Sequence, residues 1–387
     1  ASPLFNGNTW YAGITNKDGK QLFNPVYDKE KWKKAADAAK AVLDLNVYSM
    51  YNPNPSNPVD NYARLFYTRE WNETIIPYST PDNYVYEAFH LPGGRDIGGG
   101  GFMAPLQGMV DSYEMNNGYP INEPGSGYTA SGFWSGQLWD ATRFVDVTGV
   151  SNMYKNRDPR FYASIFFTGG VWVYDRINRQ LKFYYWGNSQ ARSDGWDNPG
   201  THPETGYNIR KWNTPEINLR AGTGTAHRNY PIIRLPEIYL NYAEALNEYL
   251  EKPSAEVYNA INAVRDRVSM PHLPIIPSDY TREGMRKRIQ NENRVEFAFE
   301  GHRFWDERRW LIGTEMENGP VYGLNARPSV AELQATGLDP NSEEAGKAVF
   351  YKVVKVQDRV FLRKHYLMPI GKAELDKNPN LVQNYGW

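Results

Sequence analysis

The chain has 387 residues, of which 41% are hydrophobic and 22% are charged, and its formal net charge is −1. This composition predicts a folded globular protein, and near neutrality excludes the basic surface that a general nucleic-acid binder needs. The chain contains no cysteine, which excludes disulfides, thiolate metal sites and cysteine catalysis. No apolar run reaches the roughly 18 residues that a membrane-spanning helix requires.

The first expected element is an amphipathic helix at residues 28–45. Small and apolar residues recur there at three- and four-residue spacing, and lysines occupy the opposite side. The buried face that this spacing predicts comprises Trp32, Ala35, Ala36, Ala39, Val42 and Leu43.

The region 47–230 is interrupted throughout by glycine, proline and asparagine, which favour loops and short strands. One hairpin is expected within it, with strands at 160–167 and 171–175 joined by a turn at 168–170. Residues 181–186 are expected to add a third strand.

Helices return at 234–250 and again after Pro253, a residue that suits the start of a helix. The two helices are joined by a short link, which predicts an antiparallel pair. With 28–45, they resemble the paired helices of tetratricopeptide repeats. The apolar stripe expected on the second helix is Val257, Ile261, Val264 and Val268.

A third and longer helix is expected from near Thr281 to about Leu311. Its second half, NRVEFAFEGHRFWDERRW (293–310), mixes acids, bases and aromatic rings. Spacing along a helix predicts that Glu300 pairs with Arg303 and that Glu292 pairs with Arg288. The tail that follows is expected to be loop-rich, with one or two strands around 349–356 and 361–370.

Apolar residues lie on nearly every side of this third helix, which is typical of a buried framework element. Phe299 and Trp305 are therefore expected in the core. A glycine in mid-helix costs about 1 kcal/mol, so Gly301 is expected to let another backbone or ring come close. The alternative, an active site, requires a cleft and a perturbed carboxyl group.

Motifs for catalysis, metals and cofactors are weak or missing. The six histidines are far apart, and neither a phosphate-binding loop nor a Gly-x-Ser-x-Gly elbow occurs. The acidic stretch 194–198 fits an Asx-rich turn better than a calcium loop. We expect no catalytic residue, no metal and no cofactor. A carboxyl pair for glycoside hydrolysis stays open, because its separation is set by the fold.

Aromatic residues are concentrated between residues 128 and 212, a segment that includes six of the twelve tryptophans, namely 134, 139, 172, 186, 196 and 212. Several stand in Gly/Ser/Asn-rich stretches, where a packed core is not expected. Such rings suit stacking on the apolar face of a sugar; the alternative is that they fill a core beneath the loops. For Trp139 a short helix would turn the ring inward. The candidate ligand-binding residues are Tyr128, Phe133, Trp134, Trp139 and Trp196.

Four stretches in order along the chain resemble the SusD/RagB family of nutrient-binding outer-membrane lipoproteins of Bacteroidetes. They are RLPEIYLNYAEALNE, AINAVRDRVSMP, NRVEFAFEGHRFWDERRW and the ending YLMPIGKAELDKNPNLVQNYGW. The beginning of the chain and NRDPRFYASI are also similar to that family.

The resemblance implies a mainly α fold, a tetratricopeptide-type helical scaffold with a large loop-rich insertion that contains short β-strands. It also implies glycan binding without catalysis, a SusC-like TonB-dependent transporter as partner, and a lipid anchor on the outer face of the outer membrane. Peptide binding is the alternative within the family. Because the anchoring cysteine is absent, an N-terminal part is expected to be missing.

The expected segments form one continuous domain. They are the end of the N-terminal scaffold at 1–46, the insertion at 47–230, a helical hairpin with the long helix at 231–312, and a closing tail at 313–387.

Overall fold

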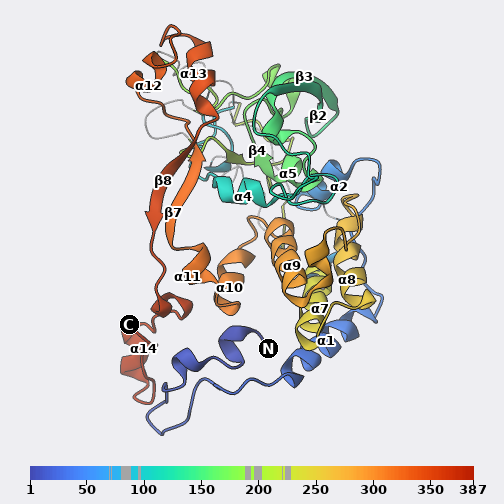
Figure 1. The fold of residues 1–387 in the computed structure, drawn as a ribbon, viewed down its shortest axis with the longest axis vertical. Helices are drawn as coiled ribbons and strands as arrows, with labels where there is room; N and C mark the ends of the chain where they lie inside the picture. Colours follow the sequence, from blue (N-terminus) through green and yellow to red (C-terminus); the bar gives the residue numbers. More distant parts are fainter. Residues whose placement is uncertain are drawn as a thin grey trace.

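The computed structural model describes residues 1–68, 70, 72–79, 89–94, 97–187, 193–195, 203–219, 221–222 and 228–387. It is mainly helical, as predicted. Figure 1 shows a lower half built from long helices, where both termini lie, and an upper half of loops, short strands and short helices. Across the described part of the chain, no helix combines the length and the apolar character needed to cross a membrane.

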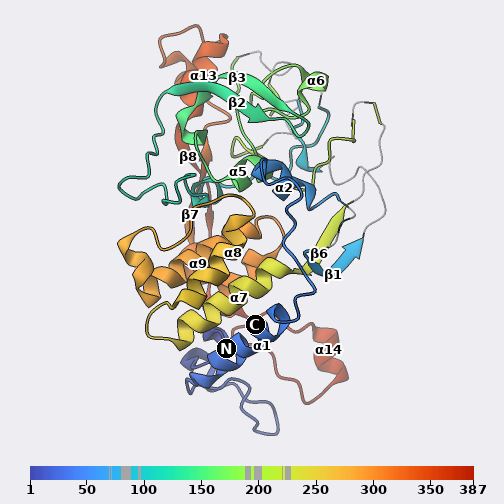
Figure 2. The same cartoon turned by 90° about the vertical axis from the view of Figure 1, so that its right-hand side faces the viewer.

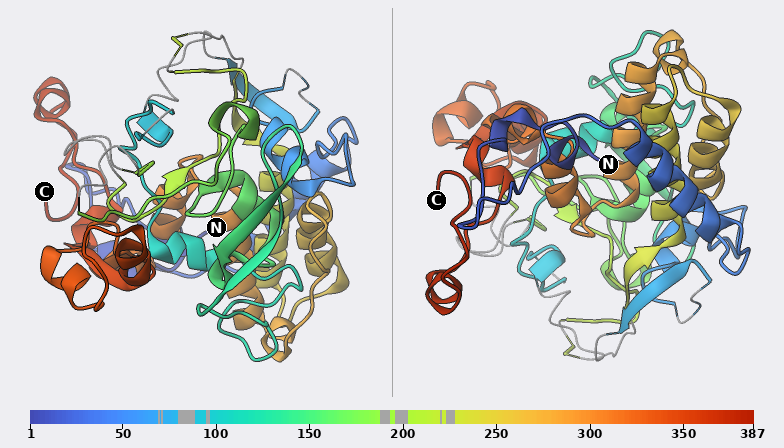
Figure 3. Two further views of the ribbon diagram at one scale, coloured as in Figure 1. Left: turned by 90° about the horizontal axis from the view of Figure 1, so that it is seen from above. Right: turned by 90° about the horizontal axis from the view of Figure 1, so that it is seen from below.

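The lower half, here called the scaffold, is made of helices from distant parts of the chain. Helix α1 (Glu30–Leu43) lies along α7 (Leu235–Tyr249), which also contacts α8 (Ala255–Asp266) and α9 (Arg282–Glu296) (Figure 2). Seen from below, the N-terminal segment and α1 cross the lower face of these helices (Figure 3). The predicted helices at 28–45, at 234–250 and after Pro253 are thus confirmed.

The predicted faces of these helices are largely confirmed. Trp32, Ala36 and Ala39 of α1 are buried in one cluster with Leu240 and Ala243 of α7. The stripe predicted for the second helix is completely buried, with Val257, Ile261, Val264 and Val268 each 0% exposed. Local periodicity was sufficient here because each helix buries only one side.

The predicted third helix is in fact two helices. Helix α9 ends at Glu296, and α10 (His302–Arg309) begins after a turn. Phe299 and Gly301 have φ angles of 64° and 83°, in the left-handed region that stops a helix. A Cβ added at Gly301 would meet nothing within 4 Å. The glycine therefore serves the turn, and the expected close approach of another group is wrong.

The turn also changes which rings are buried. Phe297, at the end of α9, is 2% exposed, whereas Trp305 of α10 is 61% exposed. Phe304 is exposed too, and Phe299 is only half-buried. The expected burial of Trp305 is wrong because α10 does not continue the buried face of α9.

The upper half contains short antiparallel pairs. Strand β2 (Phe133–Trp139) pairs with β3 (Phe144–Ser151), and β4 (Ile165–Phe166) pairs with β5 (Asn208–Ile209). The hairpin expected at 160–175 is absent, as is its third strand: residues Pro159–Ser164 form helix α5. Pro159 begins this helix, and the Asp158 carboxylate accepts a hydrogen bond from the Arg160 amide at 2.9 Å. These capping signals outweighed the strand-like composition.

In the tail, β7 (Gly319–Leu324) and β8 (Val353–Arg359) form a two-stranded arm that connects the two halves along one side (Figure 1). The strand expected around 349–356 is confirmed as β8, whereas 361–370 contains a 3-10 helix, η5 (Arg363–Tyr366). The remaining elements are η1 (Pro3–Phe5), η2 (Thr9–Tyr11), α2 (Pro58–Arg64), β1 (Thr74–Ser79), α4 (Gln107–Ser112), η3 (Asn152–Tyr154), α6 (Tyr174–Ile177), β6 (Asn229–Arg234), η4 (Pro277–Tyr280), α11 (Gly313–Met316), α12 (Val330–Gln334), α13 (Glu343–Phe350) and α14 (Lys372–Lys377).

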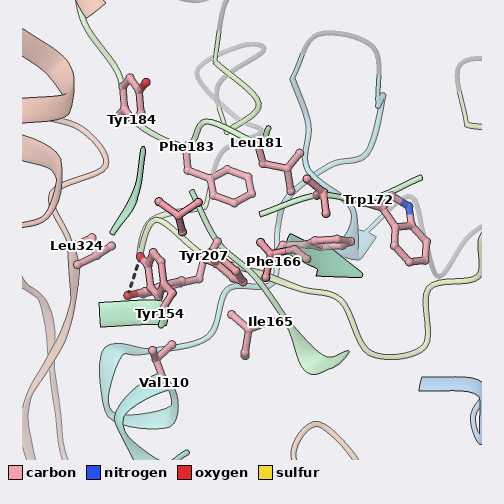
Figure 4. Packing of buried hydrophobic residues seen from close by; sticks show 14 of the residues in the cluster. Val110, Tyr154, Ile165, Phe166, Trp172, Leu181, Phe183, Tyr184, Tyr207 and Leu324 are labelled. Carbon is pink, nitrogen blue, oxygen red and sulfur yellow. Dashed lines mark hydrogen bonds between the residues drawn. The ribbon is translucent and has the colours of Figure 1, made fainter. Parts of the chain in front are cut away.

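The loop-rich upper half has a well-packed core of its own. Figure 4 shows Trp172, Phe166 and Phe183 within it, and a 3.4 Å hydrogen bond between the hydroxyls of Tyr154 and Tyr207. Trp186 and, in a neighbouring cluster, Trp212 are buried as well. Of the two interpretations left open for the aromatic residues of this region, burial in a core beneath the loops is confirmed for tryptophans 172, 186 and 212.

The two halves meet at a buried set of charged side chains, here called the charged seam. Glu296 of α9 receives a 3.0 Å hydrogen bond from Arg160 of α5 and further bonds from Arg234 and Arg267. Glu73, just before β1, accepts bonds from the same Arg234 and Arg267 at 2.8 and 2.6 Å. The seam comprises Glu73, Glu114, Asp158, Arg160, Lys211, Arg234, Arg265, Arg267, Asp279, Arg288, Glu292, Glu296 and Glu300.

The pairs predicted along the helix are wrong, because these charges reach across the seam instead. Glu300 accepts from Lys211 at 2.6 Å and from Arg234 at 2.9 Å. Arg303, its expected partner, pairs with Glu307. Glu292 and Arg288 likewise bind other residues: Glu292 bonds to Arg160 and Arg265, while Arg288 bonds to Glu114 and Asp279.

Basic partners hold two acids of the seam, Glu296 and Glu300, in the ionised form despite their burial. Burial alone opposes the charge of Glu296, but Arg267, Arg234 and Arg160 together hold its pKa well below the usual range. The pKa of Glu300 is lowered by Arg234 and Lys211 against the same opposing burial. A folded-state pKa below the unfolded value stabilises the fold above that unfolded value, and the contribution is lost as the pH falls towards the folded pKa.

We predict that Glu296→Gln lowers the free energy of unfolding by about 3–5 kcal/mol, because it leaves three buried guanidinium groups short of a counter-charge. Urea denaturation at neutral pH measures the loss. The control is Glu283→Gln on the same helix, whose side chain is 74% exposed and which is expected to change stability by less than about 0.5 kcal/mol. Equal stability of the two variants would contradict a structural role for the seam.

A second prediction compares two rings on either side of the turn. Phe297→Ala should cost about 3–5 kcal/mol, since it empties a packed position. Trp305→Ala should change stability by less than about 1 kcal/mol because the ring is on the surface. Thermal melts of both variants would show a large shift for the first only; a large shift for Trp305→Ala would place that ring in the core.

Candidate ligand-binding site

Three of the five candidate residues lie on strand β2, at different places. Phe133 and Trp134 are at its beginning, and Trp139 is at its end. Tyr128 precedes the strand, while Trp196 falls outside the described residues. The described candidates therefore do not form a single continuous platform.

Trp134 faces the core rather than solvent. Its ring is half-buried against the upper core, and its indole N–H donates to the Ser151 carbonyl of β3 at 3.2 Å. Side chains alternate along a strand, so Phe133 next to it points the other way and is 51% exposed. Trp134 thus fastens the hairpin, while Phe133 presents an open ring.

Trp139 belongs to strand β2, so the short helix considered for it is absent. Its ring meets Phe144 of β3 edge to face at 5.1 Å. On the inner side lies a void of about 10 Å³ that is also lined by Arg210, too small for more than a single water.

Tyr128 is half-buried over a fixed cation. The guanidinium of Arg157 lies 5.5 Å from its ring centroid and donates to the carbonyls of Met153, Val110 and Tyr113 at 2.6–2.8 Å. Burial raises the pKa of the Tyr128 phenol. The residue packs as a support behind the hairpin.

Phe133 opens onto a surface cavity of about 460 Å³ between the hairpin and helix α13, here called the hairpin hollow. The Tyr351 ring meets Phe133 edge to face at 5.7 Å, and the Lys347 amine lies 4.3 Å from the Phe133 centroid. The hollow is lined by Ala130, Gly132, Phe133, Ser151, Glu344, Lys347, Ala348 and Tyr351.

Helix α13 and Tyr351, the residue that follows it, supply half of this lining. Residues three or four apart share one face of a helix, which brings Glu344, Lys347, Ala348 and Tyr351 to the same side. Sequence analysis missed them, because nothing in the residues themselves connects this face to Phe133. The α13 helix is held against the upper half by Glu343, which accepts bonds from Lys182 at 2.5 Å and Tyr184 at 2.7 Å.

The hollow combines an open aromatic ring with hydrogen-bonding groups of both kinds. The ammonium of Lys347 is a hydrogen-bond donor and the carboxylate of Glu344 is an acceptor. Ser151, the last residue of β3, lies beside them. The Tyr351 hydroxyl is buried with no partner among the described residues, and burial raises its pKa. Glu344 is the one carboxyl among the described lining residues, and the described part of the chain contains no cluster of three or more side chains able to hold a metal ion.

A larger cavity of about 810 Å³ lies between the beginning of the chain, α9 and α10. Its two tryptophans, Trp32 and Trp310, are each only 6% exposed, whereas Tyr27, which also lines it, is exposed. None of the described candidate residues lines this cavity, so the hairpin hollow, which contains Phe133, is the better match to the aromatic site predicted from sequence.

The model of the SusD family matches residues 67–387. The chain belongs to the SusD family. A SusD-like protein P2 from Formosa agariphila is 29% identical over 160 residues, which is 40% of this chain and 25% of that protein. The matched stretch therefore spans about a quarter of this relative's length.

Solved structures share the fold of this SusD-family chain. BT4246 aligns over all of the chain and 68% of its own length, with 24% identity and a TM-score of 0.73. A SusD-like protein, BF3747, from Bacteroides fragilis aligns over 92% of the chain and 62% of its own, with 25% identity and a TM-score of 0.65. A SusD-like carbohydrate binding protein, BF0978, from the same species has 24% identity, the same coverage and a TM-score of 0.63. The tetratricopeptide-like scaffold expected from sequence is thereby confirmed.

We predict that two neighbouring substitutions lower the stability of the fold by different amounts. Trp134→Ala should lower the free energy of unfolding by about 1–3 kcal/mol, through lost packing and a lost hydrogen bond. Phe133→Ala should cost less than about 1 kcal/mol, since its ring is largely in solvent. Urea denaturation of both variants checks this. A larger loss for Phe133→Ala would make that ring a structural residue.

Proposed function

We propose that this SusD-family chain binds oligosaccharides at the cell surface and delivers them to a SusC-like TonB-dependent transporter. In this proposal the chain has no catalytic activity, and the whole protein is lipid-anchored on the outer face of the outer membrane. Family membership supports the class of function, and the carbohydrate binding named for the related BF0978 supports the class of ligand.

The observation that carries the proposal is the open Phe133 ring in the hairpin hollow. A phenyl face covers the apolar C–H side of a sugar, and the groups around it are able to bond to hydroxyls. Lys347 and Glu344 stand on one side of that ring, so donors and acceptors are both within the hollow. Tyr128 and Trp134 support the hairpin from behind.

Two alternatives make different use of the same surface. A peptide ligand would also be compatible with an aromatic ring beside an ammonium and a carboxylate. A glycoside hydrolase normally needs two carboxyl groups flanking the bond that is cut, and the described lining of the hollow has Glu344 alone. This favours binding without hydrolysis.

A screen of the chain against glycan and peptide arrays separates the first two ligand classes. Incubation with the glycans that bind, followed by an assay for new reducing ends, tests for hydrolysis. Binding of peptides only, or catalytic release of sugar, would each overturn the proposal. Co-purification with a TonB-dependent barrel from the native outer membrane tests the partner.

We predict that Phe133→Ala weakens binding of the glycan that the screen identifies by about 1–3 kcal/mol, on the scale known for base–aromatic stacking. Lys347→Ala should weaken it as well. The matched control is Phe144→Ala, an equally exposed ring (53% against 51%) on the other strand of the hairpin, which should leave affinity unchanged. Calorimetry measures all three. Equal affinity of Phe133→Ala and the parent chain would remove the hairpin hollow from the binding site.

A further inference from the structure

The scaffold contains a second surface cavity, of about 660 Å³, here called the scaffold pocket. It lies between strand β6, the beginning of α7, and the turn and helix α10 that follow α9. This places it in the half of the molecule opposite the hairpin hollow. Its lining includes the side chains of Glu237, Asn241, Asn293, His302, Trp305 and Arg309.

One wall of the scaffold pocket is apolar and open. Trp305 is 61% exposed and touches Phe304 edge to face at 4.9 Å. Ile232 of β6 is exposed beside the same cavity. An indole in this setting offers its face to a ligand, and tryptophan is the strongest of the rings at attracting a cation.

The opposite wall holds a carboxyl group that has no cation of its own. One oxygen of Glu237 is buried and has no hydrogen-bond partner among the described residues. Two guanidinium groups are near enough to act on its charge, but both already have carboxylate partners. Arg234 is held by Glu73, Glu296 and Glu300, and Arg309 is held by Glu244 and Asp306.

The carboxyl groups that line the cavity are those of Glu237, Glu300 and Asp306. Glu300 is paired with Lys211 and Arg234, and Asp306 is paired with Arg309. Among the described lining residues, Glu237 is therefore the carboxyl group left for a cation from outside. Burial lowers the pKa of His302, which stacks on Phe297 at 4.3 Å, so this ring is neutral at pH 7. Burial raises the pKa of Glu237 to about 7; Asp306 and Glu300 add to that effect, and Arg234 and Arg309 oppose it.

We propose that the scaffold pocket binds a primary ammonium group carried by an amino sugar in an oligosaccharide. The ammonium would lie between the Glu237 carboxylate and the face of Trp305, and the apolar side of the sugar would cover that indole. Asn241 and Asn293 supply amides for the hydroxyls. The inference rests on the carbohydrate-binding class proposed above but uses a site separate from the hairpin hollow.

A matched pair of ligands tests this proposal: a glucosamine oligomer and the N-acetylated oligomer of the same length. The two differ in the charge and the acetyl group at each nitrogen. At pH 7 the chain should bind the glucosamine oligomer at least tenfold more tightly by calorimetry. A lysine-containing peptide in a third arm shows whether the ammonium alone is sufficient; tighter binding of that peptide would overturn the assignment to a sugar.

The variants separate the scaffold pocket from the hairpin hollow. Glu237→Gln keeps the shape but removes the charge, and it should abolish the tenfold preference. Trp305→Ala should weaken binding of both oligomers at this site, whereas its neighbour Phe304→Ala, which does not line the pocket, should have no effect. Urea denaturation confirms that each variant is folded. An unchanged preference in Glu237→Gln would overturn the proposal.

The pH dependence gives a further readout. An ammonium ligand binds the ionised form of Glu237, so protonation of this group competes with binding. Because the pKa of Glu237 is about 7, affinity for the fully protonated glucosamine oligomer should fall as the pH drops below 7 and approach a tenfold loss per pH unit well below that pKa, and Glu237→Gln should lose this slope. If neutral glycans bind in a Phe133-dependent manner while the two oligomers are not distinguished, this inference fails alone. If no glycan binds at all, the proposed function fails with it.

Discussion

The arrangement of the whole molecule depends on one constraint, which is that the charges buried between its halves must all find partners. The charged seam joins Arg160 and Lys211 of the upper half to Glu296 of the scaffold and to Glu73 and Arg234 at the β1–β6 pair. Burying any one of these ions in an apolar interior without its partner would cost several kcal/mol. We infer that the seam sets the register of the fold, while the apolar clusters on either side provide most of its stability.

This constraint explains why the scaffold breaks where it does. An unbroken helix would carry Glu300 onward along the axis of α9, away from Lys211. The left-handed turn at Phe299 and Gly301 brings Glu300 back to Lys211 and Arg234. The same turn leaves the aromatic residues of α10 outside the core. A break in the helix therefore serves burial of charge on one side and exposure of Trp305 on the other.

The sequence was informative where a signal is local. Helices α1, α7 and α8 each bury one face, and the spacing of residues such as Trp32 and Val257 reveals it directly. Gly301 was a visible signal in the predicted third helix. That it ends the helix depends on the left-handed backbone conformation at Phe299 and Gly301, which the periodicity of apolar residues does not report. For residues 160–164, the capping signal of Asp158 and Pro159 is stronger than the strand preference of the aromatic Phe161 and Tyr162, which had favoured the hairpin. Partner choice in the seam was beyond prediction, since every partner comes from a distant part of the chain.

The candidate site was predictable only in part for the same reason. Phe133 was identified from its local surroundings. Lys347 and Tyr351 belong to the C-terminal tail, and only the folding of the chain brings them next to Phe133. Trp134 and Trp139 have the same local composition as Phe133, yet strand alternation and the bulk of the upper core decide which way each ring points. A list of aromatic residues in a Gly-rich stretch therefore identifies the neighbourhood of a site better than its members.

The arm formed by β7 and β8 has a consequence for how such a site can diversify. It carries α12 and α13 at its far end, so one wall of the hairpin hollow is delivered by the tail and the other by the β2–β3 hairpin. The two walls meet through the Phe133–Tyr351 ring pair and through the Lys347 amine, which lies over Phe133. The buried residues of the tail, Leu324, Leu333, Ala345 and Phe350, belong to the upper core and fix this wall in place. The side chains of Glu344, Lys347 and Ala348 line the opening instead. Substitutions at these lining positions can therefore change the molecules that a lineage captures, while the buried positions of the same segment keep the framework the same.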